Sequence, residues 1–278
     1  MLPSYVLALR EGLEAALIIG IVIGTLRKIN RPELGRTVWI GSLSAAALST
    51  LIALLLNSMG ASLEGKAEQI FEGFTMLVAA GVLTWMIFWM RRQARSLKNE
   101  LETGVRHAAI QAGKGALFFL AFTAVLREGI ELALFLTAAA LASDAQQVLT
   151  GALLGLGTAI LFGWSLFASI LKLDLRLFFQ VTGAMLILFA AGLVAYGVHE
   201  LNEAGWVPVI VEHLWDINFI LDEKSTAGAM LKALFGYNGN PSLTEVLAYL
   251  AYFIGIYLGL RREAIPTLRS KQEVQIHR

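Results

Sequence analysis

The sequence predicts an all-α, polytopic membrane protein with seven transmembrane helices, arranged as a 3+3 inverted repeat plus one extra C-terminal helix. Three observations lead to this fold class. The composition is 57% hydrophobic and only 15% charged over 278 residues, which lies outside the range of ordinary soluble domains. Connections rich and poor in basic residues alternate along the chain. One charged motif occurs twice.

Seven stretches are apolar and long enough to cross a bilayer, whose hydrocarbon core of about 30 Å needs roughly 20 helical residues. They are residues 2–26, 37–58, 69–90, 115–142, 147–170, 177–199 and 243–260. The first stretch lacks the basic start of a cleavable signal peptide, and its apolar run is interrupted by Arg10, Glu11 and Glu14. We therefore expect it to remain in the mature protein as the first transmembrane helix.

The Lys and Arg residues between these stretches predict the orientation. They concentrate in residues 27–36, 91–114 and 171–176 and in the tail after residue 260. The alternate connections carry only Lys66, Lys224 and Lys232. Because basic connections stay in the cytoplasm, the N-terminus is expected outside and the C-terminus inside a plasma membrane, which in a bacterium is the inner membrane.

An internal repeat relates the first three stretches to the next three. The segment LREGLEAAL at residues 9–17 returns as LREGIELAL at residues 126–134, and Gly41 is echoed by Gly151. A unit with an odd number of spans makes the following unit enter the membrane from the opposite side. The repeat is therefore inverted, and such repeats are typical of transporters.

The repeat and the charge pattern together predict the organisation of the chain. It consists of repeat 1 at 1–90, a cytoplasmic basic loop at 91–114, repeat 2 at 115–199, an extracytoplasmic loop at 200–242, and the seventh helix with a cytoplasmic tail at 243–278. The basic loop is expected to determine topology and to face lipid, not to bind nucleic acid.

Each motif copy places three charged side chains near the middle of an apolar helix. They are Arg10, Glu11 and Glu14 in the first copy and Arg127, Glu128 and Glu131 in the second. At about 100° per residue, the three charges of a copy share one helical face. A midplane charge costs roughly 2.5–3.5 kcal/mol on insertion scales, so all six are expected to face the bundle interior with partners.

Four glutamates against two arginines leave an excess of negative charge that a bound multivalent cation or protons would complete. Carboxylates in a chain without cysteine suit hard or borderline cations such as Fe³⁺, Fe²⁺, Mn²⁺, Mg²⁺ or Ca²⁺. The competing interpretation is that each copy forms only a structural i, i+4 ion pair, Arg10 with Glu14 and Arg127 with Glu131. That interpretation leaves Glu11 and Glu128 unexplained.

The doubled Arg-Glu-Gly-Leu/Ile-Glu motif resembles the oxidase-dependent iron transporter family, the high-affinity iron permeases of fungi and their bacterial Efe-type counterparts. The likeness extends through LTWMIFWMRR at 83–92, HELNEAGW at 199–206 and PSLTEVLAY at 241–249. It implies iron uptake across the plasma membrane, with iron as Fe³⁺ or Fe²⁺ the transported substrate and no resident cofactor. The ligands it implies are Glu11, Glu14, Glu128 and Glu131, with Arg10 and Arg127 as counter-charges.

The resemblance also bears on partners. Besides iron and the lipid bilayer, it implies a periplasmic or extracellular redox partner, an oxidase or peroxidase. Some bacterial members carry an extra extracytoplasmic domain, which the 278 residues do not contain. The partner is therefore expected to be a separate protein.

Two further groups of residues are candidates for the outer mouth of a cation pathway. Glu64, Glu68 and Glu72 follow one helical stripe, and Glu68 and Glu72 are candidate metal ligands, although acidic residues are also favoured at a helix start by the dipole. The second group is His199, Glu200 and Glu203 at the start of the long loop. We expect one acidic cavity that joins the motif glutamates to this side.

Two other functions remain as alternatives to an iron permease. One is a cation/proton exchanger for another divalent metal such as Mn²⁺, in which the glutamates relay protons. The other is an intramembrane di-iron enzyme, which would use Glu-x-x-His pairs, and the chain has no such pair. The absence of a G-x-x-x-x-G-K-[ST] sequence disfavours a pump driven by nucleotide hydrolysis, and no enzymatic activity is expected.

Overall fold

The protein is described from a computed structural model, in which residues 1–61, 63–93, 97–167, 175–223, 225, 228, 231–232 and 235–276 are placed. Every regular element in these residues is helical. Several positions in the segments considered above lie outside the described residues: 168–170 of the predicted span 147–170, and the basic residues Arg95, Lys172, Lys224 and Arg278 of the connections and the tail.

The long helices coincide with the apolar stretches of the sequence. In chain order they are α1 (Leu2–Lys28), α2 (Gly35–Ala61), α3 (Lys66–Gln93), α5 (Gly113–Ala142), α6 (Ala145–Phe167), α7 (Leu175–Glu203) and α9 (Leu243–Ile276). Shorter elements are a 3-10 turn at Pro32–Leu34, α4 (Leu97–His107) and a π-helical turn at Ala108–Ala112.

Five of these helices are long and apolar enough to cross a membrane. Their apolar stretches are Pro32–Gly60, Lys66–Met90, Ala145–Leu166, Leu177–Glu203 and Leu243–Arg262. The helices α1 and α5 are as long, at 27 and 30 residues, but each carries a charged motif near its middle. The chain is thus an all-helical, multi-pass membrane protein by the length and apolar character of its helices.

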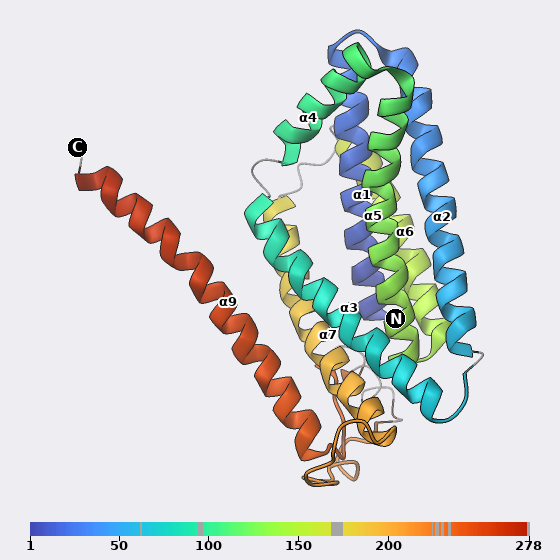
Figure 1. Cartoon of the computed structure of the whole chain (residues 1–278), viewed down its shortest axis with the longest axis vertical. Coiled ribbons are helices and arrows are strands. Elements are labelled where there is room, and N and C mark those ends of the chain that lie inside the picture. The colour runs from blue at the N-terminus through green and yellow to red at the C-terminus, as the bar shows by residue number, and fades with distance from the viewer. Residues whose placement is uncertain are drawn as a thin grey trace.

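The helices pack in pairs that cross the two halves of the chain (Figure 1). α1 packs against α6, α2 packs against α5, and α3 packs against α7, while α1 and α5 also contact each other. α9 packs against α7 and leans away from the rest of the bundle. The contact between α1 and α5 brings the two motif copies together.

The charged motifs lie between two apolar cores. One core contains Leu7 of α1 and Phe135 of α5, together with residues of α3 and α7. The other contains Ile18 of α1 and Leu117 of α5, together with residues of α2 and α4. Each motif is therefore enclosed along its own helix by buried apolar turns on both sides, which keeps Glu11, Glu128 and Glu131 out of bulk water.

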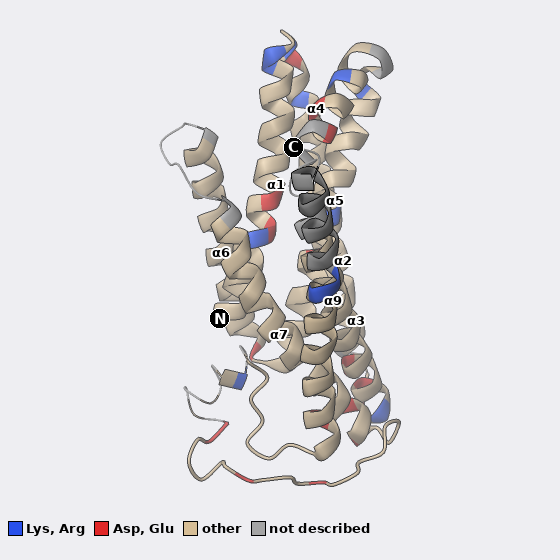
Figure 2. Ribbon diagram, turned by 90° about the vertical axis from the view of Figure 1, so that its left-hand side faces the viewer, with Lys and Arg blue, Asp and Glu red and all other residues tan. Residues whose placement is uncertain are grey.

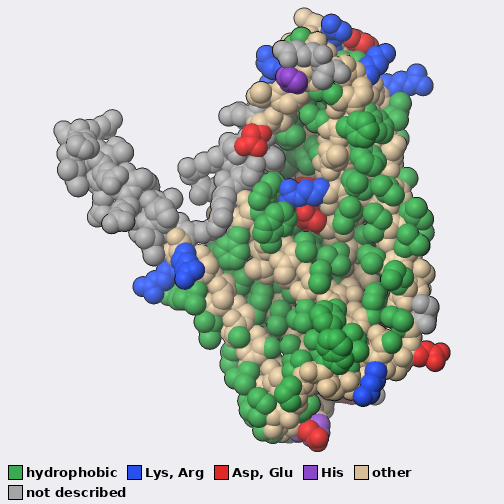
Figure 3. All heavy atoms as spheres, viewed as in Figure 1, with side chains coloured by type: hydrophobic (Ala, Val, Ile, Leu, Met, Phe, Trp, Pro, Cys, Tyr) green, Lys and Arg blue, Asp and Glu red, His purple; other side chains and the backbone are tan. Residues whose placement is uncertain are grey.

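The two ends of the bundle differ in charge (Figure 2). Basic side chains gather at the end formed by the α1–α2 connection and α4, whereas the opposite end, with the long loop after α7, is mostly acidic. Large apolar side chains such as Leu43 and Leu54 of α2, and Ile160 and Trp164 of α6, are exposed between the ends. Figure 3 shows this apolar covering on one face, with basic and acidic side chains adjacent near its middle.

The segment expected as a basic loop, 91–114, contains the helix α4. Val105 of α4 is fully buried, and Leu101 packs against the same core as Ile18 and Val22 of α1. The spacing of Leu101 and Val105, four residues apart, gives the helix one apolar face. The basic segment is therefore partly ordered against the bundle by this face.

Candidate metal centre

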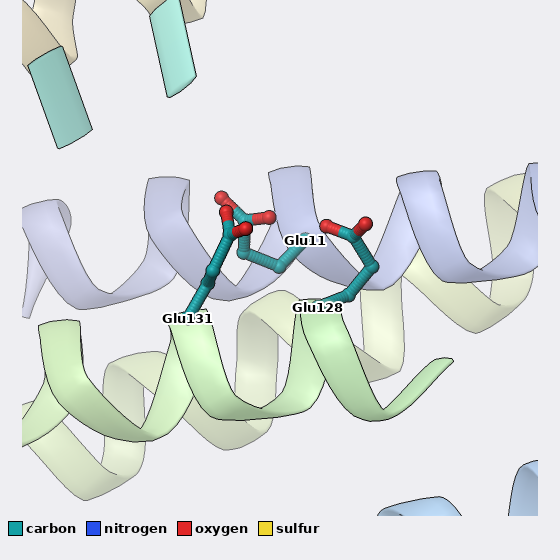
Figure 4. A group of neighbouring side chains, drawn as sticks. All are labelled: Glu11, Glu128 and Glu131. Carbon is teal, nitrogen blue, oxygen red and sulfur yellow. The ribbon is translucent and has the colours of Figure 1, made fainter. Parts of the chain in front are cut away.

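Three buried glutamates meet where α1 and α5 touch. Glu11 projects from α1, and Glu128 and Glu131 project from α5 into the space between the helices (Figure 4). One carboxylate oxygen from each lies within 4.8 Å of the others, and the residues are only 1%, 5% and 6% exposed. Among the described residues, this is the group whose oxygens converge closely enough to hold one metal ion.

The glycine of each motif allows a neighbouring helix to approach on another face. A Cβ atom at Gly12 would lie 2.7 Å from Cβ of Ala159 on α6. A Cβ atom at Gly129 would lie 2.6 Å from Cβ of Ser49 on α2. Both distances are shorter than real Cβ contacts, so each motif needs glycine at this position for close helix packing.

In the first motif copy, the arginine pairs with both glutamates. Arg10 Nη1 lies 2.6 Å from Glu11 Oε1, and Nη2 lies 2.9 Å from Glu14 Oε1. The same guanidinium donates to Met86 Sδ at 2.9 Å and to Met90 Sδ, both on α3. Arg10 is 2% exposed, and its contacts with the methionines of α3 help to fix its side chain in place.

In the second motif copy, the arginine has different surroundings. Arg127 Nε donates to Glu131 Oε1 at 2.9 Å. Its guanidinium carbon lies 3.9 Å from the ring centroid of Trp89 and 5.4 Å from that of Trp85. The Arg127 side chain is 32% exposed, so the two copies, although nearly identical in sequence, are not equivalent in structure.

The arginines leave part of the glutamate oxygens free. Glu11 Oε2, Glu128 Oε2 and Glu131 Oε2 are buried and have no hydrogen-bond partner among the residues that the structure describes. Buried oxygens without partners are costly, and a charged carboxylate is costlier than a neutral group. Three oxygens of this kind, one from each converging residue, form a donor set that a hard or borderline cation can satisfy.

The fourth motif glutamate lies beside this group. Glu14 pairs with Arg10 and has an 11% exposed side chain, but it does not share the 4.8 Å spacing of Glu11, Glu128 and Glu131. The prediction from the sequence is that all four motif glutamates surround one ion. The structure brings three of them together and places the fourth on the arginine.

The outer candidates gather at the acidic end of the bundle. Glu64 and Glu68 are exposed, and Glu72 is partly buried. Gln69, on the same turns of α3, donates to Glu203 of α7 at 2.8 Å, so the two helices meet at this end. The stripe on α3 therefore lies beside the acidic end of α7, and its members are not part of the converging group.

His199 links this end of the bundle to the long loop. Its Nδ1 atom lies 3.0 Å from Glu245 Oε1, and its Nε2 atom lies 3.3 Å from Glu203 Oε1. Gln69 of α3 donates to Glu203 Oε2 at 2.8 Å, and Asn238 of the loop donates to Glu245 Oε2 at 2.8 Å. The contacts join α3, α7, α9 and the loop.

A cavity of about 320 Å³ opens at this end. Its lining includes His199, Glu200 and Glu223, as well as Met76 of the apolar core. The motif glutamates do not line it. We expected one acidic cavity from the outer end to the motifs, but Leu7, Leu83 and Phe135 of the apolar core occupy the turns between them along α1, α3 and α5.

Several partners in and around the site were not anticipated from the sequence. Two pairs of residues on α3 have the i, i+4 spacing of one helical stripe: Met86 with Met90, and Trp85 with Trp89. This spacing predicts that each pair shares a helix face, but it does not predict which residue the pair contacts. Glu245 is 5% exposed and caps α9 together with Ser242. The Ser-x-x-Glu spacing of a capping box was a usable signal for Glu245.

Comparison with known proteins gives a consistent family. The ferrous iron permease EfeU of Escherichia coli O6:K15:H31 (strain 536 / UPEC) is 36% identical over 257 residues, covering 91% of this chain and 93% of that protein. EfeU of Yersinia pestis is 35% identical over 257 residues, covering 91% of each chain. No solved structure gives a significant match. The sequence model of the iron permease FTR1 family matches residues 1–262, so this chain belongs to that family.

Proposed function

We propose that this protein imports iron across the plasma membrane through a carboxylate site made by both motif copies. Glu11, Glu128 and Glu131 supply the ligands, and Glu14 holds Arg10 beside them. The observation that carries the proposal is the convergence of three buried carboxylates within 4.8 Å, each with one oxygen free of hydrogen bonds. Membership of a permease family supports transport rather than catalysis.

The proposed topology has seven spans, because α1 and α5 cross the membrane along with the five more apolar helices. Burial of Arg10 and of three motif glutamates between two apolar cores supports this, since these charges face the bundle interior. The basic end of the bundle lies in the cytoplasm and the acidic end outside, which places the N-terminus outside and the C-terminus inside a plasma membrane, the inner membrane of a bacterium.

The inverted repeat is supported by which helices pack together. Under the exchange of α1, α2 and α3 with α5, α6 and α7, the α1–α6 contact corresponds to the α5–α2 contact. The glycines follow the same exchange. A Cβ atom at Gly41 of α2 would meet the backbone of α5 at Phe118, and one at Gly151 of α6 would meet the backbone of Met1, the residue before α1. A pseudo-two-fold axis through the α1–α5 contact explains both pairs.

The acidic end is proposed as the region that collects cations from outside. Glu68, Glu72, Glu200 and Glu203 concentrate positive ions there through their field, and the cavity at His199 is the hollow nearest the loop. Glu64 contributes only as an exposed charge. From this end an ion reaches the motif glutamates after the apolar turns around Leu7 and Phe135 open, so the structure corresponds to a closed pathway.

The proposal is tested by uptake of radioactive iron into cells that lack their own iron permease. Glu131→Gln keeps the shape of the side chain but removes a negative charge that a cation needs, so uptake should fall to the level of cells without the protein. Glu33→Gln, at a 58% exposed side chain at the opposite end, is the matched control and should transport normally. Uptake by Glu131→Gln equal to that of the parent protein contradicts the proposed site.

A further inference from the structure

The environment of Arg10 contains two sulfur atoms that the proposed function does not use. Arg10 donates from Nη1 to Met86 Sδ at 2.9 Å and from Nη2 to Met90 Sδ. Met86 is 1% exposed, and both methionines belong to the α3 face that packs on the apolar core. An arginine with two thioether acceptors in a dry site is an unusual arrangement, because thioether sulfur is a weak acceptor.

The donors of Arg10 are only partly satisfied by its ion pairs. A guanidinium has five N–H groups, and Glu11 and Glu14 take one close contact each. Arg10 Nε is buried and has no hydrogen-bond partner. The two methionines therefore provide acceptors on the side of the guanidinium that faces α3.

Stronger acceptors lie close by. Glu11, Glu128 and Glu131 each have one buried oxygen without a partner, and the charges of Glu128 and Glu131 act on Arg10. A charge-assisted hydrogen bond to a carboxylate is about twice as strong as a neutral one. An Arg10 that was not held toward α3 would donate to these oxygens and take the place of the cation.

We propose that Met86 and Met90 are positioning residues that hold the Arg10 guanidinium on the α3 side of the site, so that an oxygen of each of Glu11, Glu128 and Glu131 stays available to the transported ion. The inference rests on the proposed function, in which these glutamates bind that ion. A thioether suits this role because it accepts an N–H without adding a charge. A carboxylate at either position would add a hard ligand and another negative charge.

The alternative for these methionines is a role in core packing alone. Replacement by leucine distinguishes the two, because leucine has a similar volume but no acceptor, and such swaps are among the best tolerated in a core. Met185 provides the matched control. It is partly buried, like Met90, and packs against the same apolar core, but its sulfur is not an acceptor for Arg10 and it does not line the cavity at His199.

The test is equilibrium binding of Fe²⁺ to the purified full-length protein in detergent under anaerobic conditions. The double variant M86L/M90L should bind Fe²⁺ about tenfold more weakly than the parent, because the ion must displace Arg10 from the free oxygens. Met185→Leu should bind like the parent. The variant M86Q/M90L, whose glutamine again offers an uncharged acceptor, should recover most of the lost affinity.

A double-mutant comparison adds a measurement of Fe²⁺ affinity that a role in core packing alone would not affect. In the Arg10→Lys background the planar fork is absent, so M86L/M90L should cause no further loss, whereas independent effects would add. Equal affinity of M86L/M90L and the parent, or an equal loss in Met185→Leu, overturns the positioning role. Failure of the parent protein itself to bind Fe²⁺, or unchanged binding by Glu128→Gln, overturns the proposed site and with it this inference.

Discussion

Arg127 of α5 lies with its guanidinium carbon 3.9 Å from the ring centroid of Trp89 on α3. Its counterpart in the first motif copy, Arg10, instead contacts two carboxylates of its own helix α1 and two thioethers of α3. A cation over an aromatic face gains roughly 0.5–1 kcal/mol when exposed and about 2 kcal/mol when desolvated. The helix α3 therefore anchors both arginines, each by different chemistry.

This difference predicts unequal effects of the same substitution. Arg10→Lys should reduce iron uptake at least tenfold and lower the melting temperature of the purified protein, because one ammonium group cannot serve Glu11, Glu14 and the methionines from a buried position. Arg127→Lys should be milder, since a lysine can keep the pair with Glu131 and lie over Trp89. Uptake assays and thermal unfolding in detergent measure both effects. Equal losses in the two variants contradict the structural difference between the copies.

The glycine of the first motif copy makes a prediction about stability. Gly12→Ala places a methyl group against Ala159 Cβ, and such overpacking typically costs about 1–3 kcal/mol. The melting temperature should fall, and Ala159→Gly in the same chain should restore it. Gly81→Ala on α3 is the control, because a Cβ atom there meets nothing within 4 Å. An unchanged melting temperature for Gly12→Ala shows that α1 and α6 do not pack as closely as described.

Glu245 makes a prediction about the long loop. Its carboxylate accepts from Asn238, contacts His199 and caps the start of α9 through Ser242. Glu245→Gln removes the charge that these groups share, so the loop should detach more readily and residues 204–242 should be cleaved faster in limited proteolysis. Glu212→Gln, at an exposed position in the same loop, should leave the cleavage rate unchanged. Cleavage at the parent rate in Glu245→Gln would contradict its role as a junction.

The helices could be predicted from the sequence because apolar stretches of membrane length have few alternatives to a helix. The motif glutamates could be singled out for the same reason, since charges in such stretches are costly. The sequence could not show that Glu14 lies apart from the other three, because helical periodicity gives the face of a side chain but not the helix opposite. The asymmetry of Arg10 and Arg127 was hidden for the same reason, since it comes from side chains on α3.

The structure of the acidic end could be predicted from the sequence only in part. Burial of Glu245 and the cavity at His199 depend on how the segment between α7 and α9 folds back onto the bundle, which local patterns do not determine. The helix α4 has an apolar face that helical spacing can reveal, but it lies within the basic segment 91–114, whose charge indicated a topology determinant. The cavity at His199 does not extend to the motif glutamates, because the core around Phe135 is filled by side chains from several helices.

The most direct test of the account is the location of bound Fe²⁺ in an experimental structure of the parent protein, by anomalous scattering from crystals grown under reducing conditions. We predict one ion between α1 and α5, with oxygens of Glu11, Glu128 and Glu131 at about 2.0–2.6 Å. The Glu128→Gln protein, crystallised under the same conditions, should lack this ion. Iron bound elsewhere, with these three glutamates distant from it, would contradict the central claim and leave the motifs as structural ion pairs.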